Sequence, residues 1–153
     1  MYLMNEPNFC GPYAIYNAKI WRGGQEPDIN LLKQRCHTTN YFGTSSENMA
    51  NVIYNDFEIS QRKSNDPTKI KKALSDGYGI ILGYKADHTD GHWAFFHQVN
   101  GIIYGVSDRK DRSVKTAIDK DIFETYLKRH YERCVGTGLF LTHPKAWFIA
   151  RLN

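Results

Sequence analysis

No segment of the sequence approaches the roughly 18 to 20 consecutive apolar residues that a membrane-spanning helix needs. The opening residues, MYLMNEPNFC, also lack the basic start and the following apolar run of a secretory signal peptide. We therefore expect a cytoplasmic protein, or one released domain of a larger protein, with no membrane partner.

Cysteine is scarce, and its spacing does not suggest pairs. The sequence has 3 cysteines, Cys10, Cys36 and Cys134, and no CxxC motif. An odd count without a secretory signal argues against a disulfide framework and favours free thiols. We interpret Cys36 and Cys134 as buried core residues, whereas Cys10 lies in a context that needs separate analysis.

A large excess of charge of one sign is also absent, since the net charge is only +4. The densest basic clusters, RKDR at 109–112 and KRHYER at 128–133, are interrupted by acidic residues, as solvated surfaces usually are. We therefore expect no nucleic-acid partner. A nucleic-acid-binding module that uses these clusters is the alternative, and its affinity for nucleic acid would fall steeply with salt concentration. His88 and His92 have the spacing of helical metal ligands, but Asp90-Gly91 between them indicates a turn, so we expect neither a metal ion nor a cofactor.

Apolar residues are plentiful enough for a core, at 41% of 153 residues. We find no internal repeat, low-complexity segment or linker, and we expect one domain over residues 1–153. The first half of the chain carries helical patterns with capping residues. They run from Cys10 to Gly23-Gly24, over 28–36 with Asp28 as cap, over 43–53 with a Ser or Thr cap, and over 66–77 with Asp66 as cap.

The pattern changes to strands in the second half. GIILGYK at 79–85 is a short apolar run bounded by glycines, which predicts a buried strand. Asn100-Gly101 is a strong hairpin signal, and it joins predicted strands at 92–99 and 102–108. Residues 119–134 again follow a helical pattern, and GLFLT and AWFIARL predict two closing strands. Helices followed by an antiparallel sheet predict an α+β fold, with N-terminal helices packed on the sheet.

Cys10 lies at the start of the first predicted helix, in NFCGPYAIYNA. A helix N-terminus and a nearby imidazolium both favour the thiolate form of a cysteine, which is the nucleophilic form. His92 opens the first strand of the predicted hairpin, where a catalytic base could face the helix tip. The alternatives are an inert cysteine at a tight corner and a histidine bonded to solvent. His97 we expect to pack against the helices.

Asp108 closes the second strand of the same hairpin. If Asn100-Gly101 forms the turn, pairing proceeds outward from Val99 and Ile102, and position 109 lies opposite His92. Cross-strand neighbours are about 5 Å apart, so the register predicts that Asp108 lies beside His92. A carboxylate there could fix the tautomer of the imidazole. Alternatively, Asp108 caps the following turn.

Three motifs in order resemble papain-like cysteine peptidases. They are CGPYA, then GHWAFF after a short buried strand, then an aspartate 16 residues past the histidine. The resemblance is to the double-glycine leader (bacteriocin-processing) peptidases and their stand-alone relatives, and it covers most of the chain. It implies a papain-like fold, with Cys10 as nucleophile, His92 as general base and acid, and Asp108 as the residue that orients it.

One position departs from that family. Its members carry a glutamine six residues before the cysteine, whose amide helps to hold the oxyanion, and here that residue is Met4. Asn5 is the candidate replacement, although it could equally be a helix-entry residue. Loss of one oxyanion donor typically costs a factor of about 10² to 10³ in rate.

The sequence therefore predicts a papain-like hydrolase of amide bonds with a peptide or protein substrate. A free peptidase, a deamidating or deconjugating enzyme, or a phage- or virus-encoded protein would fit a domain of this size. An acyltransferase would use the same triad. The alternative from another class is a catalytically inactive papain-like domain that binds a peptide or protein tail, which Met4 favours.

Overall fold

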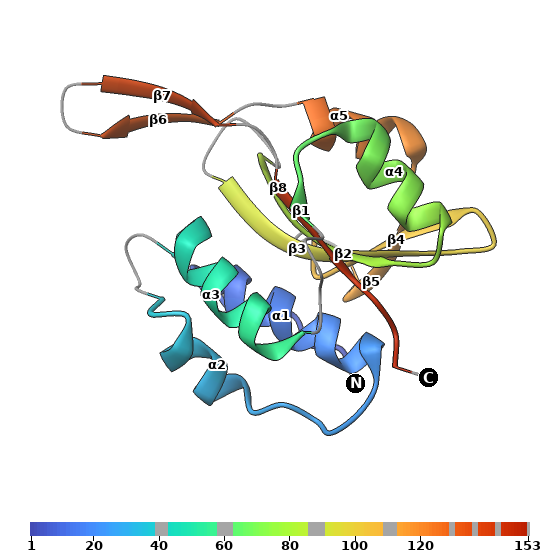
Figure 1. Cartoon of the computed structure of the whole chain (residues 1–153), viewed down its shortest axis with the longest axis horizontal. Coiled ribbons are helices and arrows are strands. Elements are labelled where there is room, and N and C mark those ends of the chain that lie inside the picture. The colour runs from blue at the N-terminus through green and yellow to red at the C-terminus, as the bar shows by residue number, and fades with distance from the viewer. Residues whose placement is uncertain are drawn as a thin grey trace.

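The structure is a computed structural model of the chain (Figure 1). It describes residues 1–38, 43–57, 63–85, 91–108, 113–128, 131–135, 138–142 and 145–152. Within these ranges no helix has the length and apolar character to cross a membrane.

The described residues form five helices, each in a segment where the sequence predicts one, and three of them begin at a predicted capping residue. They are α1 (Cys10–Arg22), α2 (Ile29–Arg35), α3 (Ser46–Asp56), α4 (Pro67–Ser75) and α5 (Lys120–Lys128). The side chains of Asp28, Ser45 and Asp66 each accept a hydrogen bond from a backbone N–H in the first turn of the helix that follows. α1 ends at Gly23, whose φ of 95° suits a residue without a side chain.

The main sheet is antiparallel and has six strands among the described residues, in the order β1-β8-β2-β3-β4-β5. The strands are β1 (Lys63–Ser64), β2 (Gly79–Lys85), β3 (Gly91–Val99), β4 (Ile102–Val106), β5 (Lys115–Ile118) and β8 (Lys145–Ile149). β2 and β3 lie at its centre, which confirms the buried strand predicted at 79–85. The short strands β1 and β5 were not predicted.

The hairpin of β3 and β4 has the predicted register. Asn100 and Gly101 both have positive φ, 51° and 79°, as the tight turn requires. Val99 pairs with Ile102, and the ladder runs to Phe95 opposite Val106. The prediction that the second strand extends to residue 108 is wrong, because β4 ends at Val106 and Ser107 has a φ of 53°.

Helices cover both faces of the sheet (Figure 1). α1, α2 and α3 pack on one face, with a core that includes Ile15, Phe95 and Trp147. α4 and α5 pack on the other face, around Leu82 and Phe96. The α+β class is thus confirmed, whereas the expectation that the N-terminal helices pack on the sheet describes only one of its two faces. The papain-like fold stays a prediction.

The helix predicted over 119–134 is wrong in its last part. α5 ends at Lys128, and residues Tyr131–Val135 form strand β6, which pairs with β7 (Gly138–Thr142). Tyr131 continues the helical spacing of apolar residues, but Tyr, Cys and Val also favour strands, and pairing with β7 decides between them. This two-stranded sheet projects away from the main sheet in Figure 1.

Candidate active site

Cys10 is the first residue of α1, and the residue before it offers no side-chain cap. Its sulfur accepts a hydrogen bond from the backbone N–H of Trp93 on β3, and the backbone N–H groups of Cys10 and Gly11 at the helix start lower the pKa of the thiol. The Trp93 nitrogen lies 3.4 Å from Cys10 Sγ. The thiol therefore occupies the positive end of a helix, where N–H donors favour a negative charge.

Burial acts against that charge. Cys10 is half-buried, and its removal from water raises the pKa of the thiol above the ordinary value, although the three N–H groups lower it. Cys36 is buried at 0% exposure, and burial raises its pKa to about 12. Both are free thiols, so Cys36 is an internal reference for an unreactive cysteine. The side chain of Cys134 lies outside the described residues.

Trp93 connects Cys10 with the sheet and with the segment before α3. The ladder between β3 and β4 ends at Phe95, short of Trp93, and the Trp93 N–H donates to Cys10 Sγ. The indole Nε1 donates to the carbonyl oxygen of Thr44 at 3.0 Å, and the ring lies 5.5 Å from that of Trp147. The sequence gave no sign that the backbone of Trp93 would contact the candidate nucleophile.

Gly83 leaves the space that the Trp93 ring occupies. A Cβ at this position would lie 2.4 Å from a carbon of the ring. We therefore expect Gly83→Ala to displace the indole from Thr44 and to lower the free energy of unfolding by about 1 to 3 kcal/mol, the usual cost of overpacking. Urea denaturation would measure this loss. Gly101→Ala, whose Cβ would meet nothing within 4 Å, controls for the loss of a glycine, although its φ of 79° adds strain there. A Gly83→Ala protein as stable as the wild type would contradict the close packing.

His92 lies on β3, directly before Trp93, so the peptide that joins them links the candidate base to the candidate nucleophile. Its ring meets the ring of Tyr84 edge-on, with centroids 5.6 Å apart. Its Nε2 lies 3.4 Å from the carbonyl oxygen of Ser107. The histidine is therefore held from two sides, by an aromatic ring and by a main-chain acceptor.

Asp108 follows Ser107 and is 1% exposed. Its carbonyl oxygen accepts a hydrogen bond of 3.2 Å from the hydroxyl of Tyr84, the residue that also packs against His92. Its side chain lies close to Gly105, where a Cβ would come within 2.8 Å of the carboxyl carbon. The structure thus brings Asp108 into the neighbourhood of His92. Asp108 is the residue after Ser107, whose carbonyl oxygen contacts the histidine.

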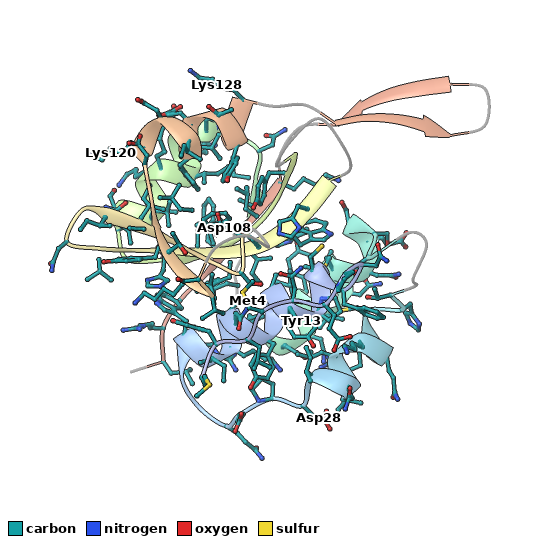
Figure 2. All side chains as sticks on the ribbon, turned by 180° about the vertical axis from the view of Figure 1, so that it is seen from behind. Met4, Tyr13, Asp28, Asp108, Lys120 and Lys128 are labelled. Atoms are coloured by element: carbon teal, nitrogen blue, oxygen red, sulfur yellow. The ribbon has the colours of Figure 1, made fainter. Side chains whose placement is uncertain are left out.

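The hydrogen bonds of Asn5 run to Ser107. The Asn5 N–H donates to Ser107 Oγ at 2.8 Å, and the same hydroxyl donates to Asn5 Oδ1. Met4 Sδ lies 3.9 Å from Ser107 Oγ, and Figure 2 labels Met4 together with Asp108, the residue that follows Ser107. The role of Asn5 as oxyanion donor stays a prediction, and its bonds to Ser107 are a second role that the sequence did not suggest.

Compared with family models, with curated proteins and with solved structures, the chain matches none. Assignment of a function therefore depends on the geometry of the chain itself. Within the described part of the chain, no group of three or more His, Cys, Asp and Glu side chains is placed to hold a metal ion. His88 and most of the basic clusters at 109–112 and 128–133 fall outside the described residues.

Proposed function

We propose that the chain is a papain-like cysteine peptidase or a related hydrolase of amide bonds, acting in the cytoplasm on a peptide or protein. Cys10 is the nucleophile, His92 the general base and acid, and Asp108 the residue that orients and electrostatically supports the histidine. The observation that carries the proposal is the 3.4 Å contact between the Trp93 N–H and Cys10 Sγ. It brings the first turn of α1 against the residue that follows His92.

The reaction has two halves, and in each half His92 takes one proton and then gives it up. His92 takes the proton of the Cys10 thiol while the sulfur attacks the carbonyl carbon of the substrate, and a C–S bond forms. When the C–N bond breaks, His92 gives the proton to the departing amine and leaves a thioester. Water then attacks the thioester, His92 takes a proton from it, and cleavage of the C–S bond returns that proton to the sulfur and releases the acid.

The tetrahedral intermediates require donors for their oxyanion. The N–H groups at the start of α1 are one source, because they lie at the same helix start as the thiol and favour its negative charge. Asn5 is the second candidate, and its Nδ2 is the donor that it could contribute while Oδ1 stays bonded to Ser107.

An inactive peptide-binding domain is the second candidate function, favoured by the effect of burial on Cys10. Burial raises the pKa of this thiol, so the local N–H groups alone do not supply a thiolate at neutral pH. Activation must then come from an ion pair with His92. Without that pair, the same site could bind a peptide tail but could not cleave it.

The alkylation rate of each cysteine by limiting iodoacetamide, from pH 5 to pH 9, distinguishes the two functions. We expect Cys10 at pH 6 to react on the order of 100 times faster than an ordinary thiol with a pKa near 8.5, and Cys36 to react far more slowly. His92→Ala should remove the advantage of Cys10, whereas His37→Asn, a change of an exposed histidine, should keep it.

A Cys10 that titrates like an ordinary or a buried thiol would overturn the hydrolase and favour the binding domain. If Cys10 is activated, new amino termini should appear in a peptide pool incubated with the wild type and not with Cys10→Ala. An amide product with a second amine in place of an acid would identify an acyltransferase instead.

A further inference from the structure

Ser107 has an unusual backbone conformation at the point where β4 ends. Its φ of 53° lies in the left-handed region, and it is 3% exposed. Such a conformation costs a non-glycine residue about 1 to 3 kcal/mol and persists where several contacts hold it, often at functional sites. The left-handed turn takes Ser107 out of the ladder, and its carbonyl oxygen reaches His92 Nε2.

Three groups hold Ser107 in place. Its N–H donates to the carbonyl oxygen of Val114 at 2.6 Å. Its hydroxyl accepts from the N–H of Asn5 and donates to Asn5 Oδ1, so that one residue satisfies both functions of the hydroxyl. The two residues are 102 positions apart in the sequence, so only the folded chain brings them together.

The N-terminal segment that carries Asn5 is itself fixed to α1. Leu3 exchanges two hydrogen bonds with the side chain of Asn17, from its N–H at 2.9 Å and to its carbonyl oxygen at 3.0 Å. Asn17 lies on α1 and is 0% exposed, so water does not compete for these bonds. Residues 3–5 thus tie the helix that begins with Cys10 to the residue that contacts His92.

We propose that Asn5 and Ser107 are positioning residues for His92: the N-terminal segment holds the Ser107 carbonyl as the acceptor of the Nε2 proton. A neutral imidazole carries one proton, so an acceptor at Nε2 leaves Nδ1 with the lone pair. Nδ1 is then the atom that takes the proton of Cys10, and Asp108 supports the charge that follows. The link to catalysis rests on the proposed function, whereas the tautomer of His92 can be tested without it.

The test is the tautomer of neutral His92 in Cys10→Ala, where no ion pair with the thiol protonates the ring. It is read from long-range proton–nitrogen NMR correlations and assigned with His92→Ala. In Cys10→Ala we expect neutral His92 to carry its proton on Nε2. Asn5→Ala and Ser107→Ala should distribute the proton over both nitrogens. They should also slow alkylation of Cys10 at pH 6 about tenfold, roughly the factor that one hydrogen bond corresponds to. Asn5→Asp keeps the acceptor oxygen and should restore both the tautomer of His92 and the alkylation rate of Cys10.

Asn30→Ala, a change of an exposed asparagine on α2, should change neither the tautomer of His92 nor the alkylation rate of Cys10. If Ser107→Ala fails to fold, Ser107→Gly tolerates the positive φ and still lacks the hydroxyl. A neutral His92 protonated on Nδ1 in Cys10→Ala, or a tautomer that Asn5→Ala leaves unchanged there, overturns the inference. A fast Cys10 in the wild type would still leave the hydrolase standing. The expected tautomer with a slow Cys10 would support the positioning role and overturn the hydrolase.

Discussion

Acidification from pH 6.5 to pH 4 should remove about 3 kcal/mol of the free energy of unfolding through a single residue, His97. Burial lowers the pKa of His97 to about 4 in the folded protein, with the positive charges of Lys115 and Arg151 as further causes. In the unfolded chain the pKa is about 6.5. Between these values the unfolded state binds more protons, so the folded state loses stability as the pH falls.

The surroundings of His97 explain why it resists protonation. The side chain is 3% exposed, and neither ring nitrogen has a hydrogen-bond partner among the described residues. Its ring stacks on those of Phe95 and Tyr104, 5.8 Å and 5.5 Å away between centroids. Lys115 lies over the ring of Tyr104, 4.6 Å from its centroid, so a charged His97 would face a cation behind that ring.

His97→Phe isolates this effect, because phenylalanine keeps the aromatic packing and cannot titrate. At pH 7 we expect the variant to be at least as stable as the wild type, since it removes two buried nitrogens without partners. Its advantage should grow to about 3 kcal/mol or more at pH 4. Urea denaturation at a series of pH values measures the difference. A constant difference between the two proteins over this range would contradict the low pKa of His97.

Asp56 makes stability depend on pH in a second range, which lies below that of His97. Arg35 and Lys19 bond its carboxylate, at 2.8 Å and 2.7 Å, and hold its pKa at about 2 against the opposing effect of burial. Because this folded pKa lies below the ordinary carboxyl value, Asp56 stabilises the protein above about pH 4, and that contribution is lost as the pH falls through about 2. The pH ranges of His97 and Asp56 barely overlap. The difference in stability between the wild type and His97→Phe above pH 4 therefore measures the effect of the histidine.

Local sequence signals predicted most of the elements. A capping side chain acts within three residues of itself, so Asp28 and Asp66 mark helix starts whatever packs on them. Asn100-Gly101 set the turn, and the turn set the register of β3 and β4 for as long as the ladder lasts. The sequence predicted a helix over 66–77, but a helical pattern does not encode which face of a sheet the helix will cover.

The signals failed where contacts across the chain decide the structure. The end of α5 and the strand β6 depend on pairing with β7, which the helical spacing around Tyr131 cannot reveal. At the candidate site, the sequence named the side chains of Cys10, His92 and Asp108. It did not name the Trp93 N–H or the Ser107 carbonyl, because backbone groups leave no trace in residue identity. A serine in a left-handed conformation likewise carries none of the signal that a glycine would.

Trp147→Ala should lower the free energy of unfolding by about 3 to 5 kcal/mol, the range for removal of a buried tryptophan. Trp147 is 0% exposed on β8, and it belongs to the core that joins the sheet to α1, α2 and α3. For a domain of this size we expect the melting temperature to fall by roughly 10 °C. Phe148→Ala is the matched control, because Phe148 is the next residue on the same strand, faces the other side and is only partly buried. Its loss should be clearly smaller.

The same substitution should reach the candidate site, because Trp147 packs against Trp93 with ring centroids 5.5 Å apart. The cavity left by Trp147 would free the Trp93 indole to move away from Thr44, and the N–H that contacts Cys10 Sγ belongs to that residue. We therefore expect Trp147→Ala to change the pH profile of Cys10 alkylation, and Phe148→Ala to leave it as in the wild type. Equal profiles for the two variants would mean that the Trp93 backbone is held by the sheet alone. The core behind β3 would then stabilise the fold without setting the geometry of the thiol.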